Sequence, residues 1–130
     1  MHGKRLPRGF SVIELMVTVA ILAILVSIAI PAYRNYISTA REAEGRNNLA
    51  ALKLAEEEFF LENNRYFAGA DTATLISNSE GLWQPTGDEE NGGVHNFTYA
   101  VTLSGGGYVA TATGTGDRVP TTTVITITKN

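Results

Sequence analysis

Residues 8–33 read RGFSVIELMVTVAILAILVSIAIPAY, and this stretch decides the fold. Beyond Arg8 it contains a single charged side chain, the carboxylate of Glu14. About 20 apolar residues in a helix, each rising about 1.5 Å, span the roughly 30 Å hydrocarbon core of a membrane. A charged side chain at the centre of such a helix costs roughly 2.5–3.5 kcal/mol on insertion scales. The stretch therefore predicts a membrane-spanning helix in which Glu14 has a specific task.

Basic residues precede the apolar stretch, namely Lys4, Arg5 and Arg8, and they predict a cytoplasmic N-terminus. A secretory signal peptide is one alternative, but its apolar region is shorter and ends at a cleavage site of the A-x-A type. Residues 31–33 match such a site poorly, and the helical pattern continues past them. A plain single-pass anchor is another alternative, and it leaves Glu14 unexplained.

The heptapeptide GFSVIEL at residues 9–15 resembles the class III leader and mature start of type IV pilins, the major pilins in particular. The resemblance extends from Arg8 to about Tyr36. It implies that a prepilin peptidase cuts after Gly9 on the cytoplasmic side and methylates the new α-amine of Phe10. Glu14 then becomes the fifth residue of the mature chain, where the family carries a glutamate.

The resemblance also implies how Glu14 acts. An ammonium and a carboxylate in low dielectric attract and offset part of their desolvation when they meet. We therefore expect Glu14 to pair with the Phe10 amine of a neighbouring subunit and to guide it into register. The alternative is that Glu14 merely lies at the subunit interface and reaches toward water.

Pro31 lies inside the predicted helix, where it removes one backbone hydrogen bond and favours a kink. Type IV pilins commonly have a proline here and a glycine earlier in the apolar segment, where this chain has Ala23. Pro31 is thus the expected weak point for local melting in a filament. We expect the hydroxyls of Thr18 and Ser27 to bond back to carbonyls of the helix.

The composition excludes several chemistries. The chain has 130 residues and no cysteine, which excludes disulfides, thiol catalysis and cysteine zinc sites. The formal charge is −3, and removal of three leader bases leaves 7 basic and 13 acidic residues, a charge of −6. An acidic mature chain argues against broad binding of nucleic acid by the monomer, and it leaves open a local basic patch on a filament. We expect no catalytic site, cofactor or metal.

Four further patterns resemble functional sites but lack the features that such sites need. His95 is the only histidine beyond His2 of the leader and reads as a loop residue. Residues 88–91 lack the spaced ligands of a calcium loop. The glycines at 105–107 precede a strand, whereas a phosphate cradle precedes a helix. The N-x-T sequon at Asn96 is a weak hint of glycosylation.

Beyond the membrane segment, the pattern predicts that the helix continues to about Asn63. An apolar stripe at helical spacing faces a core, and the acidic run at 56–58 is expected on a solvated face. A short helical turn is expected at 72–76, capped by Asp71. Trp83 is either a partly buried lid on the sheet or an exposed contact. The stripe consists of Leu49, Leu52, Ala55 and Phe59.

The last third predicts antiparallel strands at 97–103, 108–113 and 122–128, because apolar and polar residues alternate there. The expected fold is α+β, with a long N-terminal helix on a sheet of three to four strands, the fourth not being evident. The expected segments are a leader (1–9), a membrane and polymerisation helix (10–33), its amphipathic continuation (34–63), an αβ-loop (64–96) and a sheet (97–130).

The resemblance implies a structural subunit of a type IV pilus. Its expected partners are the prepilin peptidase, the assembly machinery of the inner membrane, the membrane itself and other copies of the chain. A minor pilin and a pseudopilin of type II secretion are alternatives, as is a membrane-anchored enzyme or binding protein with a coincidental leader. The sequence leaves open whether the filament serves motility, adhesion, DNA uptake or conduction.

Overall fold

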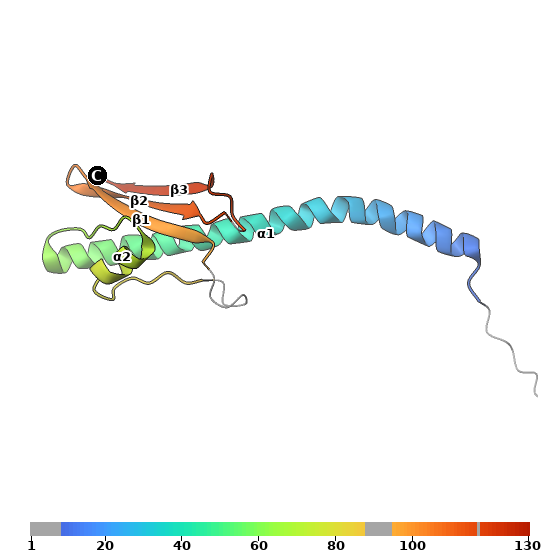
Figure 1. The fold of residues 1–130 in the computed structure, drawn as a ribbon, viewed down its shortest axis with the longest axis horizontal. Helices are drawn as coiled ribbons and strands as arrows, with labels where there is room; N and C mark the ends of the chain where they lie inside the picture. The colour runs from blue at the N-terminus through green and yellow to red at the C-terminus, as the bar shows by residue number, and fades with distance from the viewer. Residues whose placement is uncertain (1–8, 88–94, 117) are drawn as a thin grey trace, which may run out of the picture. The chain divides into compact units, whose positions relative to one another are not determined.

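The computed structural model describes residues 9–87, 95–116 and 118–130. It contains two helices followed by three strands (Figure 1). The chain divides into two compact units, Met1–Ile37 and Ser38–Asn130. We call the second unit the head. The elements are α1 (Val12–Asn63), α2 (Thr72–Asn78), β1 (Phe97–Ser104), β2 (Gly107–Gly114) and β3 (Val124–Lys129).

The first unit is the apolar part of α1. Its large side chains are exposed, Leu22 for example by 53%. The helix contains an 18-residue window that is long and apolar enough to cross a membrane, and none of that window is buried within the protein. Because exposed apolar surface is unfavourable in water, this part of α1 suits a lipid or protein environment.

The hydroxyls of Thr18 and Ser27 bond to carbonyls of the helix, as the sequence predicts. The hydroxyl of Thr18 donates to the carbonyl of Glu14 at 2.7 Å, and Ser27 donates to the carbonyl of Ile24 at 2.7 Å. The helix passes through Pro31 without interruption. Proline has no N–H to offer the carbonyl four residues earlier, that of Ser27, so the ladder lacks one bond there. Melting in a filament stays a prediction.

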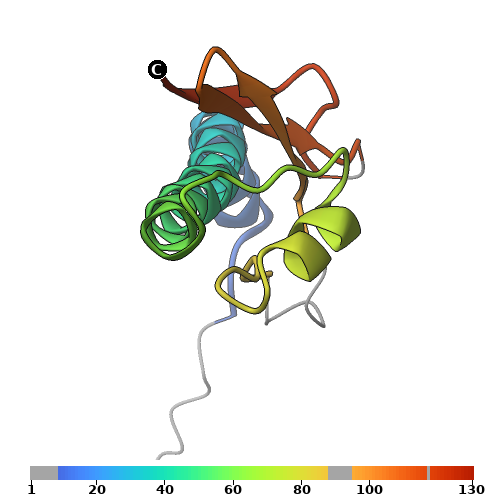
Figure 2. The ribbon, with the colours of Figure 1, turned by 90° about the vertical axis from the view of Figure 1, so that its left-hand side faces the viewer.

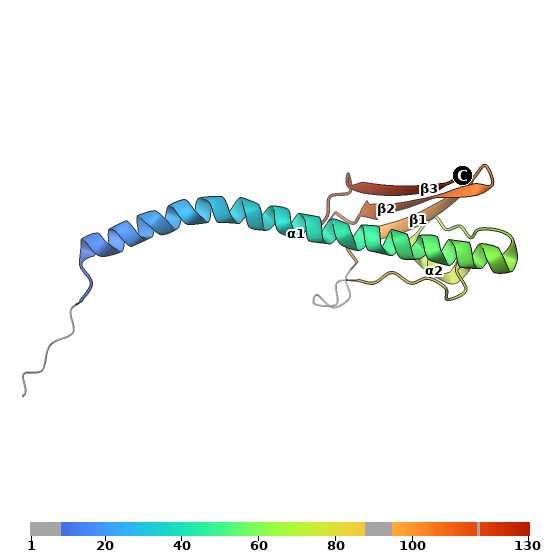
Figure 3. The same cartoon turned by 180° about the vertical axis from the view of Figure 1, so that it is seen from behind.

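The head is a helix-on-sheet unit. Its strands form one antiparallel sheet in the order β1-β2-β3, seen side by side in Figure 3. The turn between β1 and β2 contains Gly105 and Gly106 at positive φ, where a side chain would be strained. Gly107 opens β2, and a Cβ there would lie 1.9 Å from the carbonyl oxygen of Lys129. The glycine run is therefore explained by the hairpin.

The sheet has three strands in the part of the chain that the structure describes. The outer edge of β1 is not bare, because Val101 exchanges backbone hydrogen bonds of 2.8 and 3.2 Å with Gly69. The N–H of Tyr99 donates to the hydroxyl of Thr72 at 2.9 Å. The αβ-loop thus occupies the edge at which a fourth strand would have paired.

One face of the sheet covers the second part of α1 and also α2, which lie beside each other (Figure 2). The predicted stripe of α1 is buried as expected, with Leu52 0% exposed. Gly45 permits close packing, since a Cβ there would lie 3.0 Å from a ring carbon of Phe97. The core of the head is therefore formed between helix and sheet.

The αβ-loop contains the predicted cap. The carboxylate of Asp71 accepts a hydrogen bond of 2.8 Å from the N–H of Thr74, and α2 runs two residues beyond the predicted turn, to Asn78. Trp83 is 2% exposed and its ring lies edge-on to that of Tyr99 at 5.4 Å. The interpretation of Trp83 as a lid is thus the right one, and its burial is nearly complete.

The prediction for the acidic run was wrong at one position. Glu56 is 0% exposed, whereas Glu58 is exposed. Glu56 lies four residues after Leu52 and three before Phe59, so it shares their helix face. Its charge indicated a surface residue, but its place in the helical period put it in the core.

The third strand also begins later than predicted, at Val124.

Candidate processing and assembly site

The residues at the proposed cleavage point precede α1. Gly9 and Phe10 lie outside the helix, and Phe10 is 83% exposed. A Cβ on Gly9 would meet nothing within 4 Å, so packing does not require a glycine there. The basic leader residues Lys4, Arg5 and Arg8 lie outside the described residues. Gly9 and Phe10 are therefore accessible from outside the protein. No contact within the described residues explains why position 9 is a glycine.

Ser11 begins the helix. Its hydroxyl oxygen accepts a hydrogen bond of 3.2 Å from the N–H of Glu14, and its carbonyl accepts one of 3.2 Å from the N–H of Leu15. This is the geometry of an N-cap. Sequence reasoning missed it, although serine followed by glutamate three residues later is a known helix-start signature.

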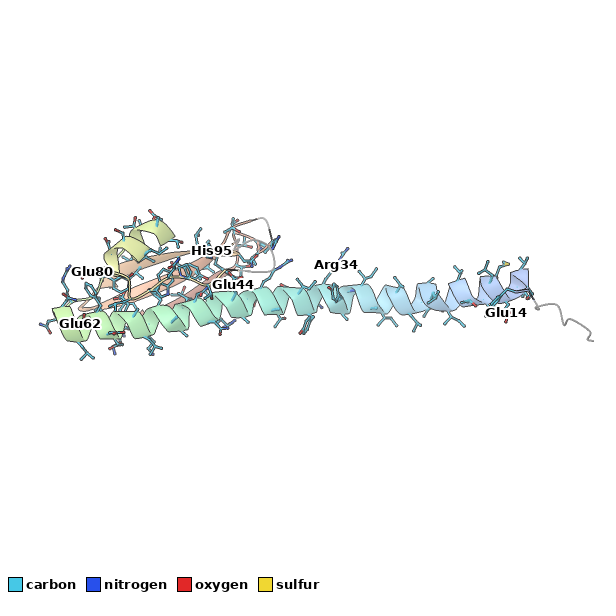
Figure 4. The ribbon with its side chains drawn as sticks, turned by 90° about the horizontal axis from the view of Figure 1, so that it is seen from below. Glu14, Arg34, Glu44, Glu62, Glu80 and His95 are labelled. Carbon is cyan, nitrogen blue, oxygen red and sulfur yellow. The ribbon has the colours of Figure 1, made fainter. Side chains whose placement is uncertain are left out.

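Glu14 lies in the first turn of α1 (Figure 4). The N-terminus of a helix carries partial positive charge, which favours a carboxylate there. The side chain is exposed and, in the part of the chain that the structure describes, no ion pair is formed by it. The carboxylate is therefore available to a partner.

The surface around these residues is continuously apolar. Exposed patches of this kind mark contacts with membranes or with other proteins. Pro31 and Tyr33 lie on it toward the end of the first unit. The exposed large side chains of the first two-thirds of the span are Phe10, Val12, Ile13, Leu15, Met16, Val17, Val19, Ile21, Leu22, Ile24, Leu25 and Val26.

A second group of polar residues, which sequence reasoning missed, points from α1 into the head. The amide nitrogen of Asn48 donates to the carbonyl of Thr86 at 2.9 Å and to the hydroxyl of Tyr99 at 2.8 Å. Its amide oxygen accepts from the N–H and the hydroxyl of Thr86 at 3.0 and 2.9 Å. The indole N–H of Trp83 donates to the Asn48 carbonyl at 3.2 Å. Asn48 thus holds Trp83 and Thr86 of the αβ-loop on the helix.

Glu44 and Arg41 hold two further connections. The carboxylate of Glu44 accepts from the backbone N–H and the side-chain amide of Asn96. Arg41 donates to the carbonyl of Arg118 at 3.1 Å. Asn96 is buried and donates its amide to Glu44, so the sequon is not a glycan acceptor in the folded head.

Glu56 holds the start of the αβ-loop. One of its oxygens accepts from the N–H of Phe67 at 3.1 Å, while the other is buried without a partner among the described residues. Burial raises the pKa of Glu56 to about 7, although the Phe67 bond opposes the shift. Neighbouring Glu57 forms an ion pair of 3.0 Å with Lys129 on β3, which raises the lysine pKa. Glu56 is therefore mostly protonated below neutral pH and loses its proton as the pH rises through about 7.

Among the described residues, no group of three or more histidine, aspartate and glutamate side chains converges as a metal site would. The run at 88–91 lies outside these residues. The candidate site is the start of α1 together with its exposed apolar surface.

Comparisons with known families agree with this location. A family described as "Prokaryotic N-terminal methylation motif" matches residues 4–30, which include Gly9, Phe10 and Glu14. A family described as "Type IV minor pilin ComP, DNA uptake sequence receptor" matches residues 31–122, well over half of the chain. The chain is a type IV pilin. Its α+β architecture is the pilin fold.

This chain is similar to individual pilins over parts of their length. The chain is 46% identical over 59 residues to the type IV major pilin protein PilA of Myxococcus xanthus, covering 45% of this chain and 27% of the relative. It is 36% identical over 104 residues to the type IV major fimbrial protein FimA of Dichelobacter nodosus, covering 75% and 66%. The match to the fimbrial protein EcpC of Eikenella corrodens is 31% over 80 residues, covering 62% and 52%.

The chain thus spans between about a quarter and two-thirds of the length of these relatives. No solved structure matches it.

Proposed function

We propose that this pilin is made as a membrane-anchored prepilin, is cleaved after Gly9, is methylated on Phe10 and becomes a structural subunit of a type IV pilus. The observation that carries the proposal is the juxtaposition of two features. An exposed, non-helical Gly9–Phe10 pair lies within the methylation motif, and it leads directly into an exposed apolar helix. The reactions are performed by a prepilin peptidase, and the chain itself has no catalytic step.

Before assembly the first unit of α1 spans the inner membrane with its N-terminus in the cytoplasm. The machinery of the inner membrane then moves subunits into the filament, where apolar helices pack against one another outside the cell. Lipid chains are as apolar as leucine, so this exchange keeps the apolar surface out of water and adds packing contacts. Pro31 is the proposed point at which the helix adapts.

Glu14 is the proposed recognition group of assembly. Cleavage creates an amine on Phe10, and the amine of a neighbouring copy is a suitable partner for the available carboxylate. A matched pair of charges would position the incoming subunit, since any other register leaves both charges unpaired in apolar surroundings.

A minor pilin is the second candidate, because the matching family that covers residues 31–122 is described as minor. That description also names a receptor for DNA, but the charge of −6 after cleavage disfavours broad DNA binding. Arg46 and Lys129 are moreover engaged with Glu42 and Glu57 at 4.0 and 3.0 Å. We therefore prefer a subunit of the filament shaft without a general affinity for DNA.

The test is mass spectrometry of sheared filaments from cells that express the chain with a prepilin peptidase and pilus machinery. The expected mass corresponds to a chain that begins at methylated Phe10 and is the main filament component. A chain that keeps its residues 1–9 would contradict the proposal. A cut chain found only in traces would favour the minor pilin.

A matched pair of variants tests the role of Glu14. Glu14→Gln is expected to be cut yet absent from filaments, because the neutral amide cannot pair with the Phe10 amine. Glu58→Gln, an exposed position on the same helix, is expected to assemble normally. Normal filaments from Glu14→Gln would remove the pairing role while leaving the family membership intact.

A further inference from the structure

We infer that Ser11 is a positioning residue for prepilin processing, because its hydroxyl stops α1 before the peptide bond that is cut. The inference rests on the proposed cleavage after Gly9. It concerns the register of the helix start, which decides whether the Gly9–Phe10 bond belongs to the helix or to an extended segment.

The hydrogen bonds at the helix start define this register. The N–H of Glu14 donates to the Ser11 hydroxyl at 3.2 Å, and the first bond to a backbone carbonyl runs from Leu15 to Ser11 at 3.2 Å. In a continuing α-helix, the Glu14 N–H would instead donate to the carbonyl of Phe10. The Ser11 hydroxyl thus occupies the donor that would extend the helix toward its N-terminus.

Extension by one more residue would reach the bond to be cut. The N–H of Ile13 would then donate to the carbonyl of Gly9, which is the carbonyl that a peptidase must attack. Glycine is itself an acceptable N-cap, so Gly9 is the natural next helix start if Ser11 loses its hydroxyl. The Ser11 cap prevents this outcome.

The experiment follows cleavage of the full-length chain in membranes that contain a prepilin peptidase, by the change in mass over time. Ser11→Ala is expected to slow cleavage about fivefold, the population change that loss of a typical N-cap produces. Ser11→Thr keeps a capping hydroxyl and is expected to stay within about twofold of the natural chain.

Ser27→Ala is the matched control. It removes a hydroxyl from the same helix, where Ser27 bonds to the carbonyl of Ile24 and caps nothing. It is expected to be cut at the rate of the natural chain. A rate for Ser11→Ala equal to that of the control would overturn the inference, and so would a Ser11→Thr variant as slow as Ser11→Ala.

A second measurement reports the position of the helix start independently of the cleavage rate. In detergent micelles, the Cα chemical shift of Phe10 is expected to move toward helical values in Ser11→Ala and to stay unchanged in Ser27→Ala. An unchanged shift in Ser11→Ala would also overturn the inference. If the natural chain itself is not cut by the peptidase, the proposed function fails. The inference about Ser11 fails instead when the natural chain is cut and Ser11→Ala is cut just as fast.

Discussion

The two parts of α1 form one helix but differ in where their apolar side chains lie. Before Ile37 the apolar side chains face outward and the hydroxyls of Thr18 and Ser27 bond to the helix's own carbonyls. From Ser38 onward the apolar stripe faces a sheet, and polar side chains enter the core. A buried polar group is stabilised by a specific hydrogen-bond partner, whereas an apolar surface needs only the absence of water.

The inward polar residues of the second part have such partners, and the partners are backbone groups of loops. Glu56, Asn48 and Glu44 receive hydrogen bonds from the N–H groups of Phe67, Thr86 and Asn96. Each bond ties a distant connection to α1. The first part of α1 has no comparable demand in the monomer, so its sequence is free to be almost uniformly apolar.

The largest expected effect comes from truncating the same residue type in the two parts. Leu52→Ala is expected to lower the free energy of unfolding of the head by about 3 kcal/mol, because a fully buried leucine leaves a cavity. Leu22→Ala should leave it unchanged, since that side chain contacts solvent or lipid. Denaturant titration of the full chain in micelles, followed by the fluorescence of Trp83, measures both. Equal effects would contradict the comparison.

Glu56 gives the head a pH dependence that the first part lacks. The pKa of Glu56 is raised from 4.5 to about 7, so the folded head binds this proton more tightly than the unfolded chain. The contribution of Glu56 to the stability of the head is therefore greatest below about pH 4.5 and is lost as the pH rises through 7, by up to about 3 kcal/mol. Glu56→Gln is expected to remove this loss and to be more stable than the natural chain at pH 8.

The control for this prediction is Glu58→Gln, which changes an exposed member of the same acidic run. Its unfolding free energy should follow the pH profile of the natural chain between pH 4.5 and 8. If Glu56→Gln also follows that profile, Glu56 does not titrate as its burial implies.

Asn48 and Asn47 are adjacent on α1, but only Asn48 is buried. Asn48→Ala is expected to destabilise the head by about 2 kcal/mol, because it leaves the buried hydroxyl of Tyr99 without this partner and removes the three bonds that hold Thr86. Asn47→Ala, one position away and exposed, should change stability by less than about 0.5 kcal/mol. Hydrogen exchange at the Thr86 amide should accelerate only in the first variant. Acceleration in neither would refute the anchoring role.

The smallest effect is expected at the cap of α2. Asp71→Ala removes the bonds to Thr74 and should lower the stability of the head by less than Asn48→Ala does. These bonds lower the pKa of Asp71, so the cap is at full strength once the carboxyl is ionised and weakens as the pH falls. The difference between variant and natural chain should therefore shrink at low pH. A constant difference would mean that the carboxylate is not the capping group.

Patterns with a short period predicted much of this fold. The long helix, the stripe led by Leu49, the Asp71 cap and three strands follow from local spacing, because each depends on neighbours within a few residues. The same reasoning failed at Glu56, whose charge suggested the surface. It also could not find Asn48, because an exposed and a buried asparagine look alike until Thr86, 38 residues away, is placed beside one of them.

The sequence by itself determined the membrane character of the first part of α1, the position of Glu14 and the match of Gly9–Phe10 to a processing motif. These are contiguous properties that need no partner from elsewhere in the chain. Only the tertiary structure decided which polar residues of α1 are buried, that the αβ-loop covers the edge of β1, and that Asn96 is closed to modification. Those outcomes depend on contacts between distant segments, whose hydrogen bonds exist only after the sheet has packed against the helix.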